Sequence, residues 1–191
     1  MQASSVLKNE HRVIEQVLSC LEKMAEQAMA GGKLDGVSAG EALDFFQNFA
    51  DKCHHGKEES LLFPLLEARG LSSEGGPTGV MRHEHEEGRG LIRGMSESAP
   101  AAAASDRNAV KRFAGYAFGF VRLMRNHVFK EDHRLFPMAD HVLNESDQRR
   151  LLDEFAHAEH HEKGAGTHDN YIKLADNLAD LFKVRRNTVT H

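Results

Sequence analysis

The strongest constraint in this sequence is an internal repeat. The segment CHHGKEESLLFP at 53–64 aligns with NHVFKEDHRLFP at 126–137, at an offset of 73 residues. The two segments share six identical positions: His54/His127, Lys57/Lys130, Glu58/Glu131, Leu62/Leu135, Phe63/Phe136 and Pro64/Pro137. The segments around His11 and His85 match in the same way, at an offset of 74 residues. The chain is therefore predicted to contain two similar halves, each built from two segments.

The segments between the breaks in the chain carry a helical pattern. Turn-forming residues gather at five places: 31–40, 70–79, 96–106, 144–147 and 164–166. Between these places the apolar residues recur at steps of three and four instead of alternating, which is typical of amphipathic helices. Helices are predicted over six ranges: 3–30, 39–69, 78–97, 106–140, 146–163 and 167–185.

This pattern predicts an all-α protein. Each of the four long amphipathic helices must bury one apolar stripe, and an antiparallel up-down four-helix bundle buries all four stripes together. Residues 1–143 are predicted to form this bundle, and residues 144–191 a C-terminal helical extension packed on it. The extension could instead cap one end of the bundle or form the contact of a homodimer, and the sequence leaves these alternatives open.

Length, charge and hydropathy exclude several classes of protein. A chain of 191 residues can bury a core without a disulfide, and Cys20 and Cys53 are expected to be buried, reduced thiols. The 24 Lys and Arg against 29 Asp and Glu give a formal net charge of −5 with no basic cluster, which argues against nucleic-acid and membrane partners. No apolar run suits a signal peptide or a membrane span, so a cytoplasmic location is expected.

Four histidines and two glutamates are predicted to face the bundle interior. Leu7, His11 and Ile14 are spaced by four and three residues, which places His11 in the apolar stripe of the first helix, and His85 lies in the matching stripe of the third helix. Residues four apart share one face of a helix, so each HxxxE pair of the repeat points one way. Six candidate metal ligands result: His11, His54, Glu58, His85, His127 and Glu131.

A bound metal explains why these polar residues are buried. An unpartnered buried carboxylate costs several kcal/mol, and inward imidazoles add further desolvated groups. Ligation by histidine and carboxylate suits Fe, Mn or Zn better than Ca or Mg, and the absence of thiolate ligands argues against an iron–sulfur centre. By symmetry, the histidine pair of each half is predicted to bind one metal, and the two glutamates to span both metals.

The six residues follow the pattern H…HxxxE…H…HxxxE on four helices. The strings HHGKEESLLFP and HxxxEDxxLFP resemble those of the hemerythrin-like, cation-binding HHE family, and the resemblance covers about residues 5–140. It implies a four-helix bundle around two non-haem Fe ions, bridged by carboxylates and by an oxo or hydroxo group, with Mn or Zn less favoured. It also implies a reaction of that centre with dioxygen, nitric oxide or peroxide.

The chain departs from the oxygen-carrying hemerythrins at the third helix. Those proteins have a second histidine one turn away on this helix, but the residues four positions from His85 are Met81 and Arg89, and His83 lies on the other side of the helix. Both irons are therefore predicted to be similarly open. This symmetry is closer to the bacterial hemerythrin-like proteins of oxidative and nitrosative stress response and iron homeostasis.

Other residues have weaker claims to the site. His55 and Glu59 form an alternative HxxxE frame, which the repeat disfavours because His55 aligns with Val128. Four carboxylates are either solvated neighbours or acceptors that orient the imidazole N–H groups: Glu10, Glu59, Glu84 and Asp132. Seven histidines without a repeat partner are expected at the surface: His133, His141, His157, His160, His161, His168 and His191.

Three classes of function are consistent with the sequence. The leading hypothesis is a diiron protein that binds or reduces a small diatomic or peroxo ligand, with peroxidase-like, catalase-like or nitric oxide-reacting turnover and an electron-donor protein as a partner. The alternative is a sensor of iron, oxygen or redox state, or an iron store, without turnover. In the third class the site takes zinc or is empty, and the repeat is only a relic of the bundle.

Overall fold

The computed structural model describes residues 2–161 and 167–187, and within these ranges it contains helices and no strand. The predicted all-α fold is confirmed. The elements in chain order, with η marking π-helical turns, are α1 (Ala3–Gly31), α2 (Gly36–Phe45), η1 (Phe46–His55), η2 (Glu58–Leu62), α3 (Phe63–Ala68), α4 (Pro77–Ala103), α5 (Arg107–Lys130), η3 (Glu131–Leu135), α6 (Phe136–Val142), α7 (Glu145–His161) and α8 (Thr167–Phe182).

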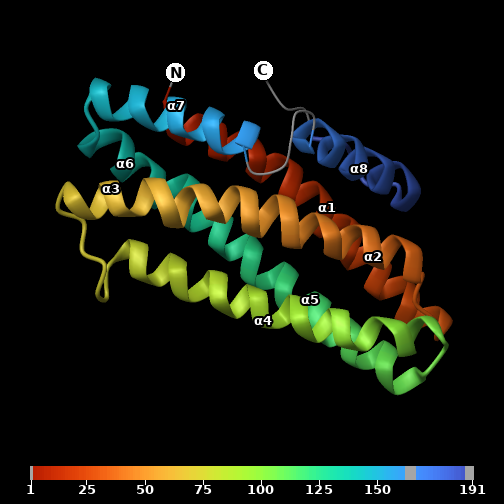
Figure 1. The fold of residues 1–191 in the computed structure, drawn as a ribbon. Helices are drawn as coiled ribbons and strands as arrows, with labels where there is room; N and C mark the ends of the chain where they lie inside the picture. The colour runs from red at the N-terminus through yellow and green to blue at the C-terminus, as the bar shows by residue number, and fades with distance from the viewer. Residues whose placement is uncertain (1, 162–166, 188–191) are drawn as a thin grey trace.

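Four helical rods form the bundle (Figure 1). The first hairpin joins α1 to the continuous rod from α2 to α3, and the second joins α4 to the rod from α5 to α6. The hairpins meet where α1 contacts α5 and where α2 and η1 contact α4. Outside the bundle, α8 lies on α1 and α2, while α7 lies on α1 and η2, so both C-terminal helices cover the first hairpin.

Three helix boundaries differ by three residues or more from those predicted, one of them the end of α8 at Phe182 instead of residue 185. The helix expected to end at residue 97 continues as α4 through Pro100 to Ala103, because the alanine-rich run after the proline favours helix. The turn is made by Ser105, at φ 68°, and by Asp106, whose side chain caps α5. The second helix starts at Gly36 instead of residue 39, because the Asp35 carboxylate accepts the N–H groups of the first helical turn.

The two prolines of the repeat lie just after π-helical turns. A proline inside a helix usually kinks or ends it, but after Pro64 and Pro137 the chain continues helically as α3 and α6. The N–H of Phe63 bonds to the carbonyl of Glu58, and that of Phe136 to the carbonyl of Glu131, so each turn is one residue wider than in an α-helix. Each proline then occupies the first turn of the next helix, where its missing N–H is tolerated.

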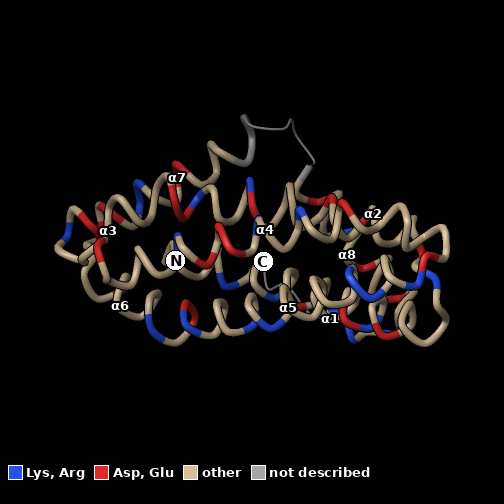
Figure 2. Tube along the Cα trace, turned by 90° about the horizontal axis from the view of Figure 1, so that it is seen from below, with Lys and Arg blue, Asp and Glu red and all other residues tan. Residues whose placement is uncertain are grey.

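The apolar core is divided into two clusters along the bundle axis. On α1, Leu7 belongs to one cluster and Ile14 to the other, and His11 lies between them. A polar layer therefore crosses the middle of the bundle. Along the helices, positions of Lys and Arg are interspersed with positions of Asp and Glu (Figure 2). None of the helices in the described ranges is both long and apolar enough to cross a membrane.

Candidate metal centre

The structure brings all six predicted ligands together in the polar layer. These six residues are each at most 1% exposed, and they are His11, His54, Glu58, His85, His127 and Glu131. The helices α1 and α4 each supply one histidine, and the second rod of each hairpin supplies a histidine and a glutamate. This placement follows from the 3.6-residue period of the inner rods together with the repeat.

The four histidines form two pairs, one in each hairpin. The Nε2 atoms of His11 and His54 are 3.0 Å apart, and those of His85 and His127 are 3.1 Å apart. The ring planes within the two pairs are inclined by 62° and 61°. The two pairs are therefore related by the same pseudo-two-fold symmetry as the sequence.

Within each hairpin, a glutamate from the first helix orients the histidine of the second. The Nδ1–H of His54 donates to Glu10 over 2.9 Å, and that of His127 donates to Glu84 over 3.0 Å. A lysine completes each group, because Lys57 donates to Glu10 and Lys130 donates to Glu84. In the sequence both lysines are visible only as repeated positions, which do not predict this role.

The other two histidines are oriented by a carboxylate from the opposite hairpin. Each of these carboxylates directly follows Glu58 or Glu131 in the sequence. The Nδ1–H of His11 donates to Asp132 over 2.8 Å, and that of His85 donates to Glu59 over 2.6 Å. The phenylalanine of each LFP string stacks on the same ring, Phe136 on His11 at 5.5 Å and Phe63 on His85 at 5.9 Å between centroids. All four neighbouring carboxylates of the sequence analysis thus accept an imidazole N–H.

The two buried glutamates each reach both histidine pairs. Glu131 Oε2 lies 3.2 Å from Nε2 of His11 and 3.3 Å from Nε2 of His127. Glu58 Oε1 lies 3.7 Å from Nε2 of His54, and its Oε2 lies 3.5 Å from Nε2 of His85. All four carboxylate oxygens are buried without a hydrogen-bond partner in the described part of the chain. Such orphaned oxygens are rare in native interiors and fit carboxylates that await a cation.

The charges in the cluster are distributed unequally. Burial raises the pKa of Glu58 well above its usual range, and the nearby Glu131 raises it further. Burial opposes ionisation of Glu131 too, but His127 and His11 hold its pKa well below the usual value. Burial lowers the pKa of His54 to about 3, whereas for His127 the Glu131 carboxylate outweighs burial and raises the pKa to about 9. These shifts favour an ionised Glu131 carboxylate beside a protonated His127 and a protonated Glu58.

The donor set of the cluster fits a metal better than any other group. Because every Nδ1 donates to a carboxylate, a neutral imidazole presents the lone pair of its Nε2 to the interior. Two lone pairs about 3 Å apart repel unless a proton or a cation is shared between them. Imidazole nitrogens with carboxylate oxygens suit Fe, Mn or Zn. The ligand atoms of His11, His54, Glu58 and Glu131 all lie within 4.8 Å of one another, as do those of a second group.

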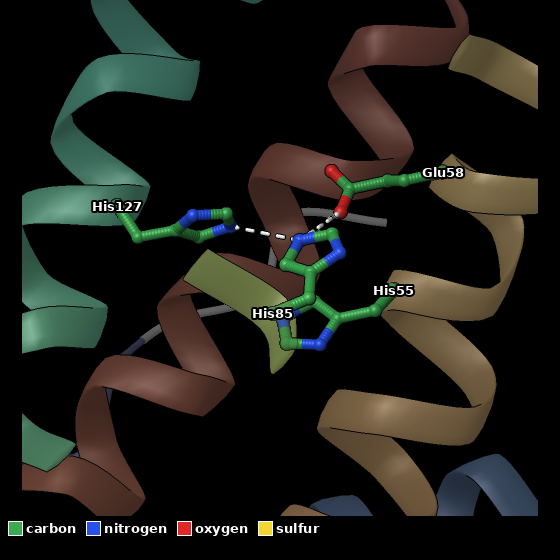
Figure 3. Close-up of side chains that lie close together, drawn as sticks. All are labelled: His55, Glu58, His85 and His127. Atoms are coloured by element: carbon green, nitrogen blue, oxygen red, sulfur yellow. Dashed lines mark hydrogen bonds and ion pairs between the residues drawn. The ribbon is translucent and has the colours of Figure 1, made fainter. Parts of the chain in front are cut away.

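The second group contains a residue that the sequence analysis left outside the site. It comprises His55, Glu58, His85 and His127, all buried (Figure 3). The sequence places His55 in the disfavoured HxxxE frame, because its repeat equivalent is Val128. The prediction of two equally open metal positions took no account of this side chain.

The remaining histidines divide between the surface and the margin of the site. His83, His133, His141 and His157 are exposed. The His168 side chain on α8 is 32% exposed, and its Nε2 lies 3.7 Å from Glu10 Oε1. His168 therefore lies beside the Glu10 carboxylate that orients His54. The side chains of His160, His161 and His191 lie outside the described residues.

Comparisons with known proteins agree with this geometry. The family model of the hemerythrin HHE cation binding domain matches residues 2–139. An uncharacterized protein of Mycobacterium bovis and two of Mycobacterium tuberculosis are each 26% identical to the chain over 177 residues, which is 93% of this chain and 68% of the relative. No solved structure matches the chain.

Proposed function

Because the chain belongs to the hemerythrin HHE cation-binding family, we propose that it is a diiron protein that binds or reacts with dioxygen, nitric oxide or a peroxide. One observation carries the proposal: two buried glutamates present four oxygens without hydrogen-bond partners, among the described residues, to four imidazole nitrogens. A single cation would leave one histidine pair without a shared charge, whereas two cations satisfy both pairs. The iron identity is part of the proposal, and Mn and Zn are its competitors.

We assign the ligands by hairpin. His11 and His54 would hold one iron, His85 and His127 the other, and Glu58 and Glu131 would bridge the two irons. Bound iron would supply redox chemistry toward a small oxidant or nitric oxide. The surrounding carboxylates fix the tautomer of every histidine and make its Nε2 a stronger donor, which is the usual role of such partners in metal sites.

The burial of the site selects for small ligands. The bridging candidates are 0% exposed, and the stacked Phe63 and Phe136 are also 0% exposed. This burial favours a diatomic molecule or a peroxide, which needs little space, over an organic substrate. We extend the proposal to a role in oxidative or nitrosative stress or in iron homeostasis, with an electron-donor protein as partner if turnover occurs.

Metal content tests the proposal directly. The protein would be reconstituted anaerobically with ferrous iron, its iron per chain measured, and its optical spectrum recorded before and after dioxygen, nitric oxide or hydrogen peroxide is added. We expect two irons per chain and a spectral change with at least one of the three reagents. Fewer than one iron per chain, or preferential retention of zinc under competition, would sink the diiron assignment.

The same preparation separates an enzyme from a sensor or store. Repeated consumption of peroxide or nitric oxide with a reductant present indicates turnover. A single stoichiometric reaction, followed by a change in the exposure of α7 or α8 to hydrogen exchange, indicates a sensor. Release of the iron on reduction, without either effect, indicates a store.

A further inference from the structure

His55 enters the polar layer although it is the direct neighbour of His54. It is 6% exposed, and its ring stacks on that of His85 with 3.8 Å between centroids and 14° between planes. Its centroid lies 5.6 Å from that of His127. Its ligand atom is within 4.8 Å of those of Glu58, His85 and His127. Figure 3 shows these four side chains close together.

The local backbone explains how two consecutive histidines face the same interior. Residues Phe46–His55 form a π-helix, whose wider turn rotates successive residues by a smaller angle than an α-helix does. His54 and His55 therefore both point inward, toward different histidine pairs. The equivalent part of the second hairpin, up to Lys130, is an ordinary α-helix and carries Val128 at this position. π-Helical turns of this kind are frequent at functional sites.

A polar network that has no counterpart in the repeat holds His55 in this orientation. The Nδ1 atom of His55 lies 3.4 Å from Asp51 Oδ1, which leaves the second ring nitrogen to face the cluster. Arg89 donates to Asp51 over 2.9 Å and to Glu59 over 2.8 Å, and Glu59 in turn holds His85. One guanidinium thus anchors both stacked rings. The repeat equivalents of Asp51 and Arg89 are Met124 and Glu15, which cannot do this.

We propose that His55 is a third histidine ligand of the metal held by His85 and His127, so that the two metal positions are chemically inequivalent. The inference rests on the proposed function, because it requires metals in the cluster. A second metal position with only His11 and His54 keeps more room for an external ligand. The asymmetry then comes from the second helix of the bundle and not from the third, where the residues four positions from His85 are Met81 and Arg89.

The test uses the full chain loaded with iron-57. We expect the Mössbauer spectrum of the wild type to show two quadrupole doublets of equal area. His55→Val, which copies the repeat equivalent, should merge them into one or lose one iron, and should weaken the tighter step of iron binding at least about tenfold in competition with a chelator. His83→Val, an exposed histidine on α4, is the matched control and should leave both readouts unchanged.

A second variant separates ligation from packing. His55→Phe keeps an aromatic ring on His85 but has no donor nitrogen, so it should behave like His55→Val. Wild-type spectra and iron affinity in His55→Phe would show that the ring only packs, and would overturn the proposal. A single doublet from wild-type protein with two irons per chain would also overturn it. Fewer than one iron per chain in the wild type would instead contradict the proposed function, and the inference with it.

Discussion

The two hairpins of the bundle supply the same residues in the same places but in different surroundings. Each contributes a histidine pair about 3 Å apart between Nε2 atoms, one buried glutamate and a lysine–glutamate pair behind the second histidine. In the described part of the chain, α7 and α8 pack mainly on the first hairpin. Its Lys57 is 2% exposed and lies 5.7 Å from the Phe155 ring of α7, whereas the Lys130 side chain is 37% exposed.

The duplication therefore determines the positions of the ligands, whereas the C-terminal helices α7 and α8 make the surroundings of the two hairpins differ. The ligand positions follow the repeat, because a helical hairpin with the same spacing places the same atoms at the bundle centre. The surroundings of each pair follow the C-terminal helices and the residues that differ between the halves, among them His55, which aligns with Val128. A symmetric set of donors therefore becomes a centre with unequal halves.

The largest expected effect comes from the glutamates that span both pairs. Glu58→Ala removes two buried donor oxygens that reach both hairpins, so it should lower metal affinity by more than about a hundredfold, because even partners outside the ligand set are commonly worth about 10- to 100-fold. Glu131→Ala should lower metal affinity by a similar factor if the two glutamates contribute equally. Metal per chain after dialysis against a chelator measures both variants.

The neighbouring carboxylate is the matched control for Glu58. Glu59→Ala removes only the acceptor of the His85 N–H and a partner of Arg89, so it should retain most of the metal under the same dialysis. Equal metal content in Glu58→Ala and Glu59→Ala would show that the repeat assigns the wrong register to this helix.

The repeat also explains which parts of the site were predictable. Two copies of one pattern identify which of many polar residues belong together, and the 3.6-residue period then gives the inward face of each helix. His11 and His85 became identifiable because each lies in an apolar stripe, although either histidine alone would be an ordinary core residue. The four supporting carboxylates adjoin the ligands in sequence, so their role was foreseeable in kind.

The unpredicted parts all depend on departures from α-helical geometry or on distant contacts. The period argument assumes 100° per residue, so it could not place His55, which a π-helix turns inward beside His54. The contact of His168 with Glu10 spans most of the chain and leaves no local pattern. The stretch around Pro100 contains the usual helix breakers, yet its alanines continue α4 to the next cap.

Replacing the buried Lys57 should lower the free energy of unfolding more than replacing the partly exposed Lys130. Lys57→Met leaves the Glu10 carboxylate, 3% exposed, without its cation, and breaking a buried ion pair on one side costs about 3 kcal/mol even where other partners remain. Lys130→Met removes a pair that water already screens and should cost at most about 1 kcal/mol. Chemical denaturation of the metal-free variants measures both. Equal losses would mean that α7 and α8 do not shield the first hairpin.

The pH dependence of metal binding should also distinguish the second helices of the two hairpins. The pKa of His127, raised to about 9, means that this histidine carries a proton at neutral pH in the metal-free protein, and a metal ligand must lose it. Apparent affinity should therefore rise with pH up to about 9, roughly tenfold per pH unit for each proton released. His54, whose pKa burial lowers to about 3, is already neutral and adds nothing in this range. Isothermal titration in buffers of different ionisation enthalpy counts the protons, and an affinity that is constant from pH 7 to pH 9 would contradict the assignment.

The smallest expected difference lies between the two carboxylates that connect the hairpins. Asp132→Asn and Glu59→Gln each replace a charged acceptor of an imidazole N–H by an amide oxygen, so each should lower metal affinity by about tenfold. The Asp132 side chain is 8% exposed and that of Glu59 is 27% exposed. Because water screens Glu59 more, its charge should contribute less to the basicity of His85 than the charge of Asp132 contributes to that of His11. Chelator competition should therefore rank Asp132→Asn below Glu59→Gln in affinity, and the reverse order would show that Arg89, which binds Glu59, matters more than burial does.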